Sequence, residues 1–165
     1  MFEIGQYVNY GKQGVCKVEA ITHMDMPGVD KDALYYVLSA VYKRDTKIYI
    51  PVDNHKVKMR GILSQTEAKE LIADIPQIAP LAVKNDKSRK DAYKDALTTC
   101  DCKEWVRVIK SIHERKQYCK AEGKKVAVTD ENFYREASDF LYGELAISLN
   151  IEKDKVEQYI INHVK

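Results

Sequence analysis

The sequence predicts an α+β protein, in which a small, strongly bent β-sheet or open barrel precedes a compact domain of four helices. Two observations lead to this prediction. Residues 6–54 contain short runs rich in Tyr, Val and Ile, separated by turn residues, as expected for the short strands of a small sheet. After about residue 86 the apolar residues recur every three or four positions, which is typical of amphipathic helices.

Four runs in the first third of the chain are expected to form strands. They cover residues 6–10, 14–21, 33–42 and 47–54. Turn residues fill the gaps, with Gly, Pro or polar side chains between consecutive runs. Pro51 cannot donate a hydrogen bond to a neighbouring strand, so it should end its strand or lie at an edge of the sheet.

A short helix is expected over residues 64–74. Ser64 precedes Glu67 by three positions, which is the pattern of a capping box at a helix start. Leu71 and Ile72 are then expected to face the sheet. This prediction places the short helix in the N-terminal domain.

The predicted domains are residues 1–75 and residues 86–165, with a linker over residues 76–85. The linker prediction depends on Pro76 and Pro80 in a stretch that is otherwise largely apolar. A linker of this composition is too apolar to be freely solvated.

Four helices are expected in the C-terminal domain. Their sequences cover residues 86–99, 102–123, 129–150 and 152–164. Thr129 or Asp130 is the expected N-cap of the third. Trp105 shares the spacing of the apolar residues that follow it, so we expect it in the core rather than on the surface.

Charge is distributed unevenly along the chain, although the net charge is only +2. Residues 1–76 contain 10 basic and 10 acidic residues, residues 77–125 contain 13 and 7, and residues 126–165 contain 4 and 8. The excess of +6 in the middle segment begins with the stretch 83–97. By itself this stretch is more typical of a solvated helix face with paired charges than of a phosphate-binding surface.

No catalytic signature is found in the sequence. It lacks a Gly-rich phosphate loop, a G-x-S-x-G motif and an H-E-x-x-H motif. The set Cys100, Cys102, His113 and Cys119 contains zinc-ligand types, but Cys102 and Cys119 lie in one predicted helix and about 25 Å apart. We therefore expect neither an enzyme nor a metal or other cofactor.

The expected location is the cytoplasm, and the expected state is a monomer. No apolar run approaches the roughly 20 residues that a membrane-spanning helix requires, and the first residues do not read as a signal peptide. The four cysteines are too sparse for a disulfide framework. We expect them to be reduced.

The sequence resembles the CarD-like family of bacterial transcription regulators. The resemblance depends on the pattern F-x-x-G-x-x-V-x-Y-x-x-x-G-V at residues 2–15, followed by KVEAI and then YYVL and IYIPVDN. VRVIKSI and FLYGELAISL continue it in the C-terminal half. The resemblance implies an N-terminal Tudor-like module, shared with transcription-repair coupling factors, that binds the β subunit of RNA polymerase. It also implies a helical domain that contacts promoter DNA near the transcription bubble.

On the polymerase side, the resemblance places the contact on one strand and one additional position. These residues are Lys47, Ile48, Tyr49, Ile50, Pro51 and Met24. Met24 and Tyr49 align with arginines that contact polymerase in relatives. If the polymerase contact is retained, strand addition through backbone hydrogen bonds and apolar packing must contribute a larger share of the binding free energy here.

On the DNA side, relatives carry a tryptophan that wedges into the minor groove, and here its position falls on Asp86 or Lys87. Neither side chain can act as a wedge. The residues expected to contact phosphates, without reading sequence, are Lys84, Lys87, Ser88, Arg89, Lys90 and Lys94.

Two functions are compatible with these observations. The first is a non-enzymatic regulator that binds polymerase and promoter DNA and modulates open-complex formation. The alternative is an adaptor on polymerase whose helical domain binds another protein and not DNA, which the acids interspersed in the basic stretch favour.

Overall fold

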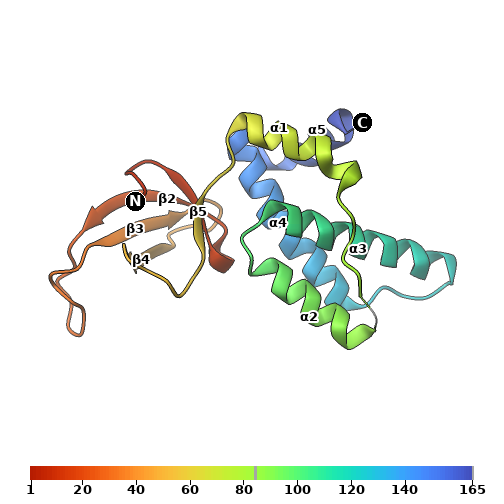
Figure 1. The fold of residues 1–165 in the computed structure, drawn as a ribbon, viewed down its shortest axis with the longest axis horizontal. Coiled ribbons are helices and arrows are strands. Elements are labelled where there is room, and N and C mark those ends of the chain that lie inside the picture. The colour runs from red at the N-terminus through yellow and green to blue at the C-terminus, as the bar shows by residue number, and fades with distance from the viewer. Residues whose placement is uncertain (84, 165) are drawn as a thin grey trace. The chain divides into compact units, whose positions relative to one another are not determined.

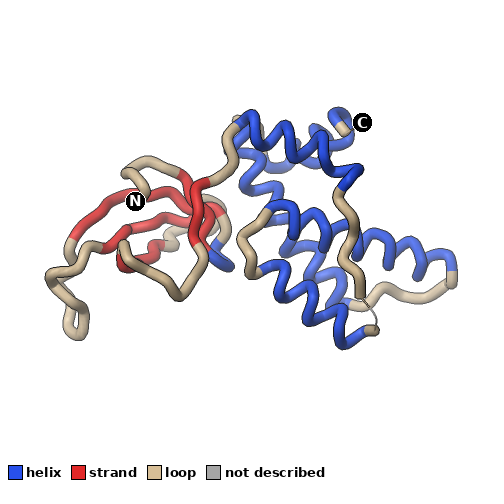
Figure 2. Tube along the Cα trace, viewed as in Figure 1, coloured by secondary structure: helices blue, strands red, loops and turns tan. Residues whose placement is uncertain are grey.

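A computed structural model describes residues 1–83 and 85–164 of the chain. Over these residues, a five-stranded antiparallel sheet precedes five α-helices (Figures 1 and 2). The predicted α+β class is therefore confirmed. The chain divides into two compact units, residues 1–62 and 63–165.

The sheet unit contains a meander whose first strand also pairs with the last one. The strands are β1 (Tyr7–Tyr10), β2 (Val15–Thr22), β3 (Tyr35–Ala40), β4 (Lys47–Pro51) and β5 (Met59–Gly61). Their order in the sheet is β4-β3-β2-β1-β5, so β4 and β5 form its two edges. Val8, Val18 and Leu38 are fully buried in a core on one face of the sheet.

The helical unit contains α1 (Gln65–Asp74), α2 (Asp86–Leu97), α3 (Cys102–Ala121), α4 (Val128–Leu149) and α5 (Val156–His163). Its core surrounds Trp105, whose ring centroid lies 5.4 Å from that of Phe140. The expected core position of Trp105 is confirmed. In the part of the chain that the structure describes, no helix is both long and apolar enough to cross a bilayer.

Helix α1 packs with the other helices, although the sequence analysis placed it with the sheet. Its capping box is present, but Leu71 and Ile72 are buried in the core of the helical unit and do not belong to the sheet core. The residue before this cap, Leu63, is hydrogen-bonded to two side chains of α4. Glu144 Oε2 accepts the Leu63 N–H at 2.8 Å, and Ser148 Oγ donates to the Leu63 carbonyl at 2.7 Å. The boundary between the units therefore lies before α1 and not near residue 75.

The segment expected as a linker is part of the helical unit. Ile78 and Leu81 pack against its core. Lys110 Nζ donates to the Ile78 carbonyl at 2.6 Å, and Ser111 Oγ accepts the Leu81 N–H at 2.7 Å. Because the segment is apolar and its backbone groups find partners on α3, it is bound to this helix and does not connect the two units.

A buried ion pair joins the starts of α2 and α4. Arg89 Nε and Nη2 each donate to one carboxylate oxygen of Asp130 at 3.3 Å, and the two residues are only 7% and 1% exposed. The N-cap of α4 is Ala127, so neither Thr129 nor Asp130, the two residues expected there, occupies the cap position. Bidentate pairing satisfies both charges in the interior and fixes the orientation of their side chains.

Replacing Asp130 with alanine is expected to destabilise the protein by about 3–5 kcal/mol, because the buried Arg89 charge loses its partner. The matched control is Asp139→Ala on the same helix, where the Asp139 side chain is exposed and forms an ion pair at 3.5 Å with the partly exposed Lys153. Its removal should change stability by about 1 kcal/mol or less. Urea denaturation measures both, and equal costs would contradict the assigned role of the buried pair.

Candidate functional site

Strand β4 forms an open edge of the sheet, with β3 as its only neighbour in the described sheet. The β3–β4 pairing continues past both strand ends. The Val52 N–H donates to the Leu34 carbonyl at 2.9 Å, and the Ala40 N–H donates to the Thr46 carbonyl at 3.1 Å. These two bonds establish which positions of β4 direct their backbone toward β3.

Because hydrogen-bonded and non-hydrogen-bonded pairs alternate in an antiparallel ladder, Ile48 and Ile50 bond to β3. Lys47, Tyr49 and Pro51 then direct their backbone groups away from the sheet. Pro51 lacks an N–H, so it occupies a position where no bond of the ladder is lost. Its predicted placement at a strand end and sheet edge is confirmed.

The side chains of β4 alternate in the same way. Ile50 is buried and Ile48 packs against the sheet core, whereas Lys47 is exposed and Tyr49 is 50% exposed. Met24 lies outside the sheet, in the segment that connects β2 and β3. The structure therefore brings five of the six expected polymerase contacts together in one edge strand.

Helix α2 separates the expected DNA contacts into an exposed and a buried set. Lys87, Lys90 and Lys94 recur at helical spacing on the exposed side, and none forms an ion pair with another described residue. Ser88 is exposed as well, and its N–H donates to the N-cap Asn85 at 2.8 Å. Lys84 lies outside the described residues.

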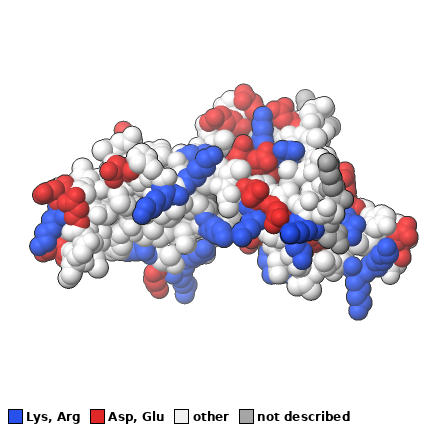
Figure 3. All heavy atoms as spheres, turned by 60° about the horizontal axis from the view of Figure 1, so that its bottom comes forward, with Lys and Arg blue, Asp and Glu red and all other residues white. Residues whose placement is uncertain are grey.

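Arg89 belongs to the opposite side of α2. Together with Tyr93 and Leu97 it faces the interior, where Asp130 neutralises its charge. The stretch 83–97 is thus neither wholly a solvated face nor wholly a basic surface. In Figure 3, basic and acidic side chains are interspersed over the visible face of the helical unit.

A second basic surface, which was not predicted from the sequence, lies at the C-terminal end of α3. Residues 115–125 contain five Lys or Arg and one acidic residue. Among them Tyr118 is 47% exposed, with the Arg115 guanidinium 5.4 Å and the Lys124 ammonium 5.6 Å from its ring centroid. The local charge count could have identified this surface, but not the stacking of both cations on one ring.

The zinc-ligand types noted in the sequence are not assembled into a site. Cys102 and Cys119 lie at opposite ends of α3, and the Cys102 thiol is hydrogen-bonded to Glu144 at 3.3 Å. Within residues 1–83 and 85–164, no three His, Cys, Asp or Glu side chains are grouped as metal ligands would be.

Comparison with known families identifies both units. The model of the CarD-like/TRCF RID domain matches residues 2–63, and that of the CarD C-terminal domain matches residues 78–161. The first match ends one residue beyond the sheet unit. A search of curated proteins finds no match. The chain therefore belongs to the CarD-like family, whose members are non-enzymatic transcription regulators that interact with RNA polymerase.

Proposed function

We propose that this regulator binds the β subunit of RNA polymerase by strand addition at β4, and that its helical unit contacts promoter DNA and modulates open-complex formation. The observation that carries the proposal is the open edge of β4, where Lys47 and Tyr49 direct backbone N–H and C=O groups outward. We further propose that the protein acts as a cytoplasmic monomer without a cofactor.

The composition of the edge indicates how a partner strand would bind. Lys47 and Tyr49 can each donate and accept one backbone hydrogen bond, whereas Pro51 can only accept. This difference restricts the register of an incoming strand. Since Met24 and Tyr49 replace the arginines of relatives, the exposed Tyr49 ring supplies apolar contact area in place of charge.

For DNA we propose contacts to phosphates from Lys87, Lys90 and Lys94, and also from Ser88 and from Lys84, which lies outside the described residues. Lysines spaced along one exposed helix face suit a row of phosphates and read no sequence. Arg115 and Lys124, both close to the Tyr118 ring, form the second basic surface of this unit. Arg89 is excluded from these contacts because its guanidinium is buried and paired.

Tyr49→Glu should weaken binding to the isolated β subunit at least about tenfold, which corresponds to about 1.4 kcal/mol. The substitution introduces a carboxylate that a partner strand would desolvate. Ile4→Glu, an exposed apolar position outside β4, is the control and should bind as the wild type does. Surface plasmon resonance measures both, and unchanged affinity in Tyr49→Glu would remove this residue from the interface.

Combined replacement of Lys87, Lys90 and Lys94 with glutamine should make DNA binding weaker and less sensitive to salt. Loss of three phosphate contacts reduces the slope of log affinity against log salt by roughly 2.7, at about 0.9 per contact. Fluorescence anisotropy with a promoter duplex between about 50 and 200 mM salt measures the slope.

The control for this experiment carries the same charge change in the sheet unit, at the exposed residues Lys12, Lys31 and Lys56. It should leave the slope unchanged. An equal effect of both triple variants would show that only net charge matters. If the wild type fails to bind DNA at low salt, the adaptor function is favoured, for which the exposed Asp91 and Asp95 beside the lysines are the supporting observation.

The effect on open-complex lifetime should be smaller than that of relatives with the wedge tryptophan, because neither Asp86 nor Lys87 can hold an unstacked base step open. Lys87→Trp should lengthen the lifetime, whereas Lys94→Trp, two turns further along α2, should not. Competitor-challenge kinetics on a single promoter measure the lifetime. A wild-type effect equal to that of a wedge-bearing relative would refute this explanation.

A further inference from the structure

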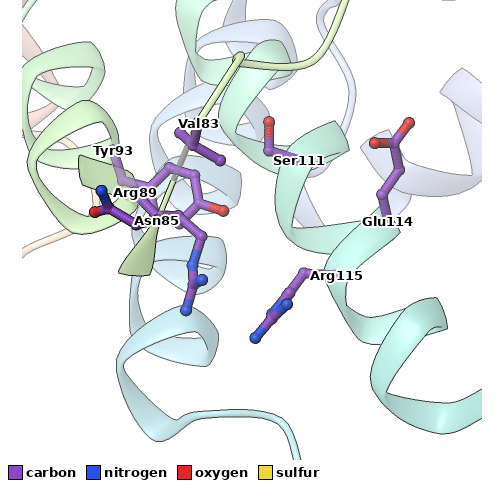
Figure 4. A pocket seen from close by; sticks show the side chains of 7 residues that line it. All are labelled: Val83, Asn85, Arg89, Tyr93, Ser111, Glu114 and Arg115. Carbon is purple, nitrogen blue, oxygen red and sulfur yellow. The ribbon is translucent and has the colours of Figure 1, made fainter. Parts of the chain in front are cut away.

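A cavity of about 310 Å³ lies within the helical unit, between the start of α2 and the middle of α3. Figure 4 shows the side chains around it. They are those of Val83, Asn85, Arg89, Tyr93, Ser111, Glu114 and Arg115. A volume of this size is at the lower end of the range for small-molecule sites.

Tyr93 is the most buried of the aromatic and charged residues that line the cavity. The residue is 0% exposed, and its hydroxyl has no hydrogen-bond partner among the described residues. Its ring is held in an edge-to-face contact with Phe133, at a centroid distance of 5.6 Å. Buried hydroxyls are nearly always paired, and leaving one unpaired costs about 1–3 kcal/mol. The position therefore suggests that this hydroxyl donates to a ligand.

Two guanidinium groups accompany this hydroxyl. In Figure 4 the Arg115 side chain extends toward the guanidinium of Arg89, and the Glu114 carboxylate points away from both. Burial raises the pKa of Tyr93 to about 12, with Asp130 adding to the increase and Arg89 and Arg115 opposing it. The phenol is therefore protonated at neutral pH and remains a hydrogen-bond donor.

The charge of Arg115 is available to a ligand. Asp130 neutralises Arg89, but Arg115 forms no ion pair with any described residue and only stacks on Tyr118. A ligand in the cavity would thus encounter one uncompensated guanidinium, one polarised by its own partner, and one phenolic donor. Guanidinium and hydroxyl donors of this kind recognise oxyanions, and arginine is particularly suited to phosphate.

We propose that this cavity is an oxyanion site that binds a phosphate group. Tyr93 and Arg115 donate hydrogen bonds to the phosphate, and Arg89 lines the cavity. Because the cavity exceeds the size of a bare phosphate, the ligand is a phosphate ester, carried by a small molecule or by the nucleic-acid backbone. The proposal goes beyond DNA contact by the lysines of α2, since these are not among the residues that line the cavity.

The test uses the full-length protein with inorganic phosphate and a nucleoside 5′-monophosphate as probes, against potassium chloride of equal ionic strength. Calorimetry should detect binding to the wild type, and Tyr93→Phe and Arg115→Gln should each weaken it at least about tenfold. Tyr93→Phe removes only an unpartnered hydroxyl, so without ligand its thermal stability should equal or exceed that of the wild type.

The matched controls are Tyr142→Phe and Arg135→Gln, which remove the same groups from a separate cavity of the helical unit. Both should bind the probes as the wild type does. Absence of probe and duplex binding in the wild type, or unchanged binding of both ligands in Tyr93→Phe, would overturn the proposal.

The same variants identify the source of the phosphate. If Tyr93→Phe loses the free ester but keeps its affinity for duplex DNA, the site binds a small molecule. If it loses both, the ester and the backbone share the site, and if it loses duplex affinity alone, the phosphate belongs to DNA. The lysine variants of α2 test DNA contact separately, so failure of one proposal is distinguishable from failure of the other.

Discussion

Arg89 and Asp130 form a bidentate ion pair in the interior of the helical unit, and the surfaces of this unit depend on it. The pair fixes the rotation of α2 about its axis. With Arg89 turned inward, Tyr93 and Leu97 follow on the same side and enter the core. Lys87, Lys90 and Lys94 then lie on the opposite, exposed side of the helix. A buried guanidinium thus determines which cations remain available at the surface.

In the sheet unit, the comparable constraint is the absence of a backbone N–H donor at one residue of β4. Pro51 has no N–H, so it is compatible with β4 only where the backbone faces away from β3. Strand β4 is an edge of the sheet, where the outward backbone groups of Lys47 and Tyr49 can pair with a partner strand, whereas Pro51 offers no donor. The same proline limits the register in which a partner can pair.

The predicted strands, the capping box at Ser64 and the core position of Trp105 follow from local patterns, and the structure contains all of them. Two predictions failed for one reason. Leu71 was expected against the sheet, and residues 76–85 were expected to be a linker, but both pack on the other helices. Apolar residues indicate that a surface is buried without indicating against which partner. The Leu63 contacts with Glu144 and Ser148, which set the boundary, span more than eighty residues.

The sequence by itself determined the α+β class, the order of the elements, the family and the concentration of positive charge in the middle of the chain. The periodicity of apolar residues and the positions of turn residues involve only neighbours in the sequence, and charges can be summed along a segment. These properties can therefore be predicted without knowing the tertiary structure. Only the tertiary structure decided that Arg89 is buried while Lys87, Lys90 and Lys94 remain exposed. It also placed the unpartnered Tyr93 hydroxyl beside Arg115 of another helix. Each of these facts depends on a contact between segments distant in sequence, and no local pattern contains that information.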